Sequence, residues 1–290
     1  KMPDGPAQIY DVAFNDNKFS LGSFSSSLTE STFWVVFIYG VFINLQNYGV
    51  DQNYIQRYLI SDSDKKAKTS ALMGGLLYIP VSAFFLLIGT SLYAYFSILG
   101  GLPEEYQIMT DKVFPFFIVN HIPVGVSGLL IASIFAAGMS TISTSFNSSS
   151  TILLEDYYNR LFRKNKSERN SMIFLYTSSL IIAILSICVA LAMVNAKSVL
   201  DIWWKYASIL SGGMLGLFLL GVFTKTDNRS GVVGLFSGII MIIFLTIYPI
   251  INQTEEGLAH PYLTIVLGTI TIFLTGCIFK FISYLNKNHI

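Results

Sequence analysis

The sequence predicts an all-α, polytopic membrane protein with about seven transmembrane helices. Of the 290 residues, 53% are hydrophobic and only 12% are charged, and the apolar residues are gathered into long runs. A helix of about 20 apolar residues crosses the roughly 30 Å of hydrocarbon in a bilayer. The net charge of +1 comes with no basic stripe in the sequence, so we expect the lipid bilayer, and no nucleic acid, as a partner.

The chain begins with a polar stretch, residues 1–32, which we expect to be a solvated extracellular loop. Seven apolar segments follow, and each is expected to form a helix: 33–58, 70–97, 124–157, 172–195, 203–223, 231–251 and 263–285. Most of the Lys and Arg residues in the connections fall on one side of these segments. The positive-inside rule makes that side cytoplasmic and places the C-terminus there. We therefore expect a protein of the cytoplasmic (inner) membrane, with further helices upstream of residue 1.

The first segment changes character halfway along. After Ile43 it continues with amides, an acid and an arginine, and Gly40 and Gly49 would allow the helix to bend or break. Amides at membrane depth are unfavourable unless they line a cavity or pair with each other. Asn44 is therefore a candidate for binding a polar solute. Beyond Asn47, the alternative is that the helix simply leaves the membrane.

The third segment contains a hydroxyl-rich stretch, residues 133–151. On a helix, many of its small and hydroxyl residues share one face, among them Ala137, Ser140, Thr141, Ser143 and Thr144. Such a face can supply the neutral oxygens that replace the water shell of a sodium ion. It can equally let two helices approach closely, with the hydroxyls bonding back to their own helix. The spacing leaves both interpretations open.

Other classes of function have little support in the sequence. A membrane-embedded enzyme would need a nucleophile with a base, or a metal motif such as HExxH, and the sequence contains neither pattern. We therefore do not expect an enzyme. A sensor or a channel on the same scaffold remains an alternative, because a fold does not determine its function.

Three motifs resemble those of the sodium/solute symporters, a family that includes sodium/galactose and sodium/sialic-acid transporters. The motifs occur in order over nearly the whole chain: residues 51–58 (DQNYIQRY), residues 136–157 and residues 216–225 (GLFLLGVFTK). The resemblance implies sodium-coupled symport of a small polar organic solute, such as a sugar, a sialic acid or a polyol, across the cytoplasmic membrane.

The resemblance also implies a fold. It is the LeuT-type inverted repeat of five plus five core helices, of which this chain looks like the second half. Residues 33–223 would form the second repeat, core helices six to ten, and residues 224–290 would form two peripheral transmembrane helices. The missing N-terminal repeat would then be a required partner, and an inactive fragment lacking that repeat is a further alternative.

Finally, the resemblance implies site residues. The main sodium site would use the carbonyl of Ala137 and the hydroxyls of Ser140 and Thr141, with two more carbonyls from the absent first core helix. Ser143 and Thr144 match a second sodium site that is found in the sialic-acid members.

The implied solute site consists of Asn44, Asn47 and Trp204. Asn47 stands where the galactose members have a gate tyrosine, and Trp204 stands approximately where they have a glutamine. Galactose is therefore not the expected solute. Trp204 also fits an interfacial aromatic belt.

Overall fold

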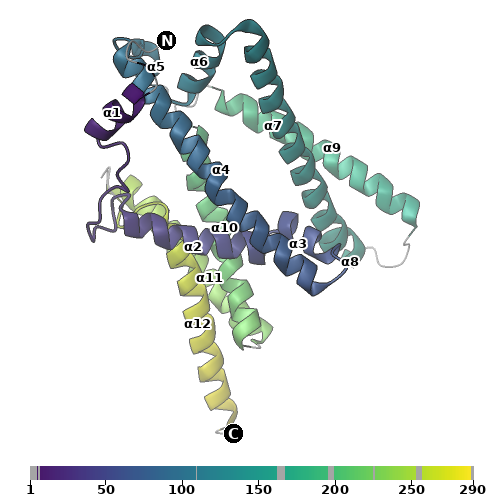
Figure 1. The fold of residues 1–290 in the computed structure, drawn as a ribbon. Coiled ribbons are helices and arrows are strands. Elements are labelled where there is room, and N and C mark those ends of the chain that lie inside the picture. The colour runs from purple at the N-terminus through teal and green to yellow at the C-terminus, as the bar shows by residue number, and fades with distance from the viewer. Residues whose placement is uncertain are drawn as a thin grey trace. The chain divides into compact units, whose positions relative to one another are not determined.

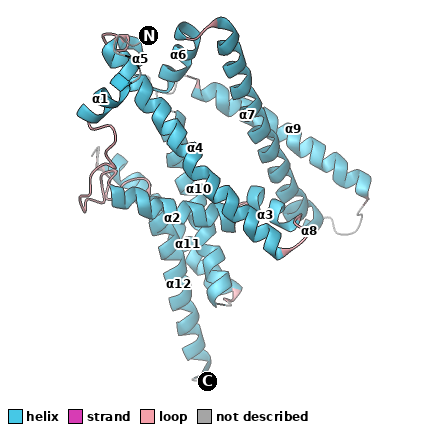
Figure 2. Cartoon of the chain, in the orientation of Figure 1, coloured by secondary structure: helices cyan, strands magenta, loops and turns pink. Residues whose placement is uncertain are grey.

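The structure is a computed structural model that describes residues 5, 7–108, 110–161, 167–194, 199–224, 226–252 and 257–288. Every regular element within these ranges is a helix (Figures 1 and 2). The chain divides into two compact units, which are described separately below. Unit 1 contains Lys1–Ile9 and Phe84–Val199, and unit 2 contains Tyr10–Ala83 and Leu200–Ile290.

Unit 1 is built from the second half of α4 and the elements that follow it. Their bounds are α4 (Asp64–Ile98), α5 (Glu104–Ile108), the 3-10 helix η1 (Thr110–Lys112), α6 (Val113–His121), α7 (Val124–Ile152), the π-helix η2 (Leu153–Tyr158), α8 (Asn159–Leu161) and α9 (Glu168–Met193). The long helices of this unit are α7 and α9, which pack against each other at the C-terminal end of α7.

The contact of α7 and η2 with α9 is made by small polar and aromatic side chains. The hydroxyls of Ser150 and Ser179 are hydrogen-bonded at 2.7 Å, and the ring of Tyr158 stacks on that of Phe174 with centroids 4.6 Å apart. Ser150 is only 1% exposed. Small residues at this point let the two helices approach closely.

At the other end of unit 1, an aromatic cluster holds α6 against the end of α4. The hydroxyl of Tyr95 lies 3.0 Å from Nδ1 of His121, and the rings of Phe117 and His121 are stacked. After α4, Gly100 and Gly101 have φ angles of 94° and 101°. Only glycine adopts this left-handed conformation without strain, so these two residues allow the chain to reverse towards α5 and α6.

Unit 2 is built from both ends of the chain. Its elements are most of α1 (Ala7–Asn15), α2 (Phe33–Gly49), α3 (Gln52–Leu59), the first half of α4, nearly all of α10 (Val199–Thr224), α11 (Asn228–Ile251) and α12 (Leu263–Asn288). Helix α1 lies within the polar stretch 1–32, for which no helix was predicted. Aromatic contacts of Tyr10 with Phe14 and Phe19 accompany this short helix.

The core of unit 2 lies along α12, which packs against α2 and against α11. Val35 and Tyr39 of α2 are buried against the start of α12, and the rings of Tyr39 and Tyr262 stack with centroids 4.8 Å apart. Between α11 and α12 the backbones are close, because glycines face Ile272: a Cβ atom added at Gly234 would lie 2.9 Å from the Ile272 carbonyl oxygen. Close packing of this kind is typical of membrane helices.

All seven apolar segments predicted from the sequence are helical. Five helices of the described chain are long and apolar enough to cross a membrane: α4, α7 continued to Leu161, α9, α11 and α12. Helices α2 and α3 together form a sixth candidate span, which is bent by 46° just after Gly49. The remaining predicted segment, 203–223, corresponds to α10, a helix of 26 residues. The break after Gly49 falls at one of the two glycines where a bend was expected.

Candidate functional site

The predicted sodium ligands all lie on α7, and the two threonine hydroxyls among them bond to their own helix. The Thr141 hydroxyl donates a hydrogen bond to the Ala137 carbonyl oxygen at 3.1 Å, and the Thr144 hydroxyl donates to the Ser140 carbonyl oxygen at 2.9 Å. This geometry is common for threonine within a helix, because its hydroxyl reaches the carbonyl one turn earlier.

The two kinds of oxygen differ in the acceptor capacity that remains. A hydroxyl that donates its proton to the Ala137 carbonyl still carries two lone pairs on Oγ1. The Ala137 carbonyl oxygen accepts both this hydroxyl and, within the helix, the Thr141 amide. The Thr141 hydroxyl oxygen can therefore contact a cation as it stands, and the Ala137 carbonyl oxygen can do so if the Thr141 hydroxyl turns away from it.

The exposure of α7 differs sharply between its two halves. Every residue from 131 to 143 is exposed, whereas Ser148 and Ser150 nearer the C-terminal end are buried. Close helix packing therefore accounts for the serines at the α9 contact. The hydroxyls of Ser140, Thr141 and Ser143 have no such contact in the described part of the chain. Thr144, which is half-buried, lies at the boundary between the halves.

The predicted solute residues belong to unit 2. Asn44 is exposed on α2, and its amide nitrogen donates to the Gly40 carbonyl oxygen at 2.7 Å, which leaves its amide oxygen as an acceptor. Asn47 is half-buried one turn later. Trp204 lies in α10, and its side chain falls outside the described residues.

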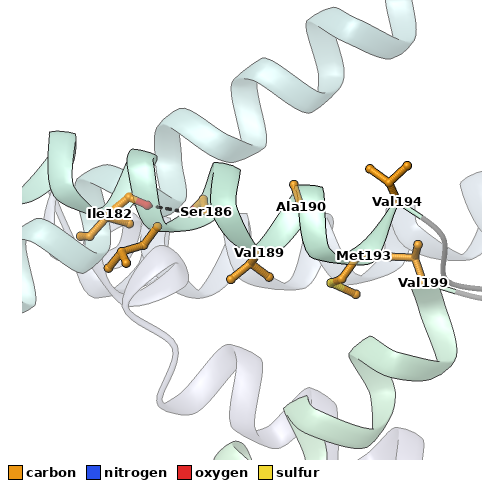
Figure 3. A pocket seen from close by; sticks show the side chains of 8 residues that line it. Ile182, Ser186, Val189, Ala190, Met193, Val194 and Val199 are labelled. Carbon is orange, nitrogen blue, oxygen red and sulfur yellow. Dashed lines mark hydrogen bonds between the residues drawn. The ribbon is translucent and has the colours of Figure 1, made fainter.

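A hollow on the surface of unit 1 does not coincide with these residues. It runs along α9 to the start of α10 and is lined mainly by aliphatic side chains, including Ile182, Val189 and Met193 (Figure 3). Its polar member is Ser186, whose hydroxyl donates to the Ile182 carbonyl oxygen at 2.8 Å. The hollow therefore has the character of a membrane-facing surface.

A third amide of the predicted run lies beside these residues. Gln46 lies in the same turn of α2 as Asn44 and Asn47, but it is only 6% exposed. The sequence pattern gives one signal for this difference, because residues two apart on a helix point in nearly opposite directions.

The hydroxyl-bearing face of α7 and the break between α2 and α3 together indicate the class of protein. The protein is a helical integral membrane protein in which one long helix presents neutral oxygens and another apolar span is broken. Secondary transporters bind ions and solutes at such broken helices and hydroxyl-bearing faces.

Comparison with known proteins identifies the family. The sodium:solute symporter family matches residues 7–242. The chain is 32% identical to the sodium/sialic acid symporter SiaT of Proteus mirabilis, over 93% of this chain and 55% of that protein. It is 30% identical to the sodium/sialic acid symporter NanT of Aliivibrio fischeri, over 99% of this chain and 56% of that protein. The chain belongs to the sodium:solute symporter family.

A solved structure shows the same fold. The chain superimposes on a Na+-coupled sialic acid symporter, in a substrate-bound outward-open state, with a TM-score of 0.83 and 30% sequence identity. The match covers 96% of this chain and 56% of that one. The chain thus spans about half the length of the relatives it matches.

Proposed function

We propose that the protein acts in sodium-coupled symport of a small polar organic solute, with sialic acid as the first solute to test. The observation that carries this proposal is the exposed set of neutral oxygens at Ala137, Ser140 and Thr141, on a helix of a sodium:solute symporter. Two relatives of the chain are sodium/sialic acid symporters. Transport fits the family better than catalysis does.

For the sodium ion, the proposed ligands are the Ala137 carbonyl oxygen and the hydroxyl oxygens of Ser140 and Thr141. Sodium is a hard cation that favours oxygen ligands, and these oxygens carry no charge. The ion needs further ligands from outside this helix. Ser143 and Thr144 are proposed to contribute to a second sodium site one turn away, with Ser140 shared between the two.

For the solute, the proposed contacts come from α2 and α10. The free amide oxygen of Asn44 can accept a hydrogen bond from a solute hydroxyl or amide, because its amide nitrogen is already held by the Gly40 carbonyl. Asn47, which is half-buried one turn further along α2, would add a second amide. Trp204 would add a flat apolar surface. Asn44→Ala should therefore raise the KM for the solute and leave the sodium dependence unchanged.

The proposed coupling has a defined driving force. One positive charge moving through 100 mV releases about 2.3 kcal/mol, which would concentrate a neutral solute about 50-fold. A second sodium ion would square that ratio. Sodium bound to α7 is proposed to favour the conformation that receives the solute, since a ligand shifts an equilibrium only through its different affinity for two states.

The proposed membrane and orientation rest on charge. We propose the cytoplasmic (inner) membrane with the C-terminus inside, because the Lys- and Arg-rich connections lie on one side of the spans. We also propose that residues 33–223 are a second five-helix repeat and that residues 224–290 are peripheral helices, with the N-terminal repeat as partner.

Uptake into proteoliposomes tests the function. The purified protein, with the proposed N-terminal repeat present and reconstituted in sealed vesicles, should accumulate radiolabelled sialic acid when an inward sodium gradient is imposed, and accumulation should stop when the gradient is dissipated. A potassium gradient of the same size is the control. Equal uptake with sodium and potassium would refute coupling to sodium.

A thermal-shift measurement separates binding from transport. Sodium chloride should raise the melting temperature above that in potassium chloride at equal ionic strength, and a bound solute should raise it further. This screen also compares sialic acids with sugars and polyols.

A further inference from the structure

Two buried polar atoms in the described part of the chain lack a hydrogen-bond partner. They are Oε1 of Gln46 and the hydroxyl oxygen of Tyr58. Buried polar groups in proteins are nearly always paired, so each exception calls for an explanation. The buried Ser150 and Ser178 of unit 1 follow the rule, since both hydroxyls are hydrogen-bonded.

Both atoms lie in the same bent span, one on each side of its break. Gln46 is in the last turn of α2, and Tyr58 is in the last turn of α3. The span bends by 46° between them, and the two helices can be followed in Figure 2. This coincidence links the unpaired atoms to the break.

Gln46 also forms the break through its backbone. Its carbonyl oxygen accepts hydrogen bonds from the amides of both Val50, at 2.8 Å, and Asp51, at 3.2 Å. In a continuous helix, the Asp51 amide would donate to the Asn47 carbonyl oxygen instead. The Asp51 side chain then caps α3 by accepting from the Asn53 amide at 2.8 Å. The break is therefore a defined structure with its own hydrogen bonds.

The side chain of Gln46 faces away from the proposed solute contact. It follows Val35 and Tyr39 on the buried face of α2, and it lies two residues from the exposed Asn44. Oε1 is shielded from solvent. A solute that reaches Asn44 would not reach Oε1 in this conformation, so a different arrangement of the span is needed to give this atom a partner.

We propose that Gln46 and Tyr58 disfavour the conformation described here at the α2–α3 break, which acts as the hinge of this span. Both groups would gain hydrogen-bond partners when the hinge moves. The proposal rests on the proposed function, because a symporter must alternate between at least two conformations. An unpaired buried polar group typically disfavours a state by about 5- to 150-fold.

Hydrogen–deuterium exchange of the protein in lipid nanodiscs tests the hinge directly. Gln46→Met keeps the length of the side chain and removes the unpaired oxygen, and Tyr58→Phe removes only the hydroxyl. Each variant should stabilise the present conformation and slow amide exchange at Val50 and Asp51 by about fivefold or more. Gln52→Met is the matched control, because Gln52 is half-buried at the start of α3, and it should leave exchange unchanged.

Unchanged or faster exchange in both variants would overturn the proposal. Faster exchange would mean that the side chains stabilise this conformation. Unchanged exchange would mean that they are already satisfied, for example by bound water. If Gln46→Met does not fold, Tyr58→Phe alone decides the question.

The exchange measurement needs neither sodium nor solute. The hinge can therefore fail while sodium-driven uptake stands, and the symport proposal can fail while the hinge stands. In uptake assays, Gln46→Met should lower the turnover rate and leave the sodium concentration for half-maximal uptake unchanged.

Discussion

Replacing Thr141 with alanine should separate sodium binding from folding. The Thr141 hydroxyl is exposed, and its hydrogen bond goes to the Ala137 carbonyl of its own helix at 3.1 Å. Its loss should therefore change the free energy of unfolding by no more than about 0.5 kcal/mol. A polar contact to a charged group is worth about 1.5–3 kcal/mol. If the oxygen is a sodium ligand, the sodium concentration for half-maximal uptake should rise by about 10- to 150-fold.

The assay is sodium-dependent uptake, or the sodium-induced shift in melting temperature where uptake is too slow. Thr177→Ala on α9 is the matched control, because Thr177 is also exposed and its hydroxyl also bonds to its own helix, with the Ile173 carbonyl at 2.9 Å. This variant should keep the sodium dependence of the unmodified protein. Equal sodium dependence in the Thr141 and Thr177 variants would refute the role of Thr141, whatever their stability.

Three further predictions concern stability. Gly234→Ala places a Cβ atom 2.9 Å from the Ile272 carbonyl oxygen and should reduce the free energy of unfolding by about 1–3 kcal/mol in denaturant titrations; Gly231→Ala, where nothing lies within 4 Å, should not reduce it. Thr32→Ala removes the side-chain cap of α2, which accepts from the Val35 amide, and should reduce it by about 1 kcal/mol, with Thr32→Ser restoring it. Burial lowers the pKa of His260, whose Nδ1 accepts from the Tyr262 amide. The unfolded chain therefore takes up a proton at higher pH than the folded one, so the melting temperature should fall as the pH drops below about 6.5; in His260→Asn this part of the fall should be absent.

The glycine contacts behind the Gly234 prediction also explain why α11 and α12 pack together more extensively than any other helix pair of the described chain. Ile272 fills the space that glycines leave on α11, and the Ser237 and Thr275 hydroxyls are hydrogen-bonded at 2.6 Å across the same interface. In lipid the hydrophobic effect does not drive helices together, so packing and polar contacts of this kind must do so.

Some elements of the fold could be read from local patterns and others could not. The apolar runs predicted each long helix, because a backbone in hydrocarbon must satisfy its own hydrogen bonds. Gly49 marked the position of the break. Helix α1, in contrast, was missed: its nine residues are too few for a strong periodic signal, and aromatic contacts of Tyr10 accompany it.

The same division applies to the candidate site. The spacing of Ser140, Thr141 and Thr144 placed their oxygens on one face of a helix, yet it could not distinguish an ion-binding face from a packing face. The difference depends on what surrounds the helix: Ser150 is buried against α9, while residues 131–143 are exposed.

The sequence by itself determined that this is a helical membrane protein with one hydroxyl-bearing span, because hydropathy and helical periodicity are local properties of the chain. Only the tertiary structure decided that Asn44 is exposed while Gln46, two residues later, is buried without a partner for its amide oxygen. Helical periodicity places the two side chains on opposite faces, but which face is buried and what it bonds to depend on neighbours that are distant in sequence.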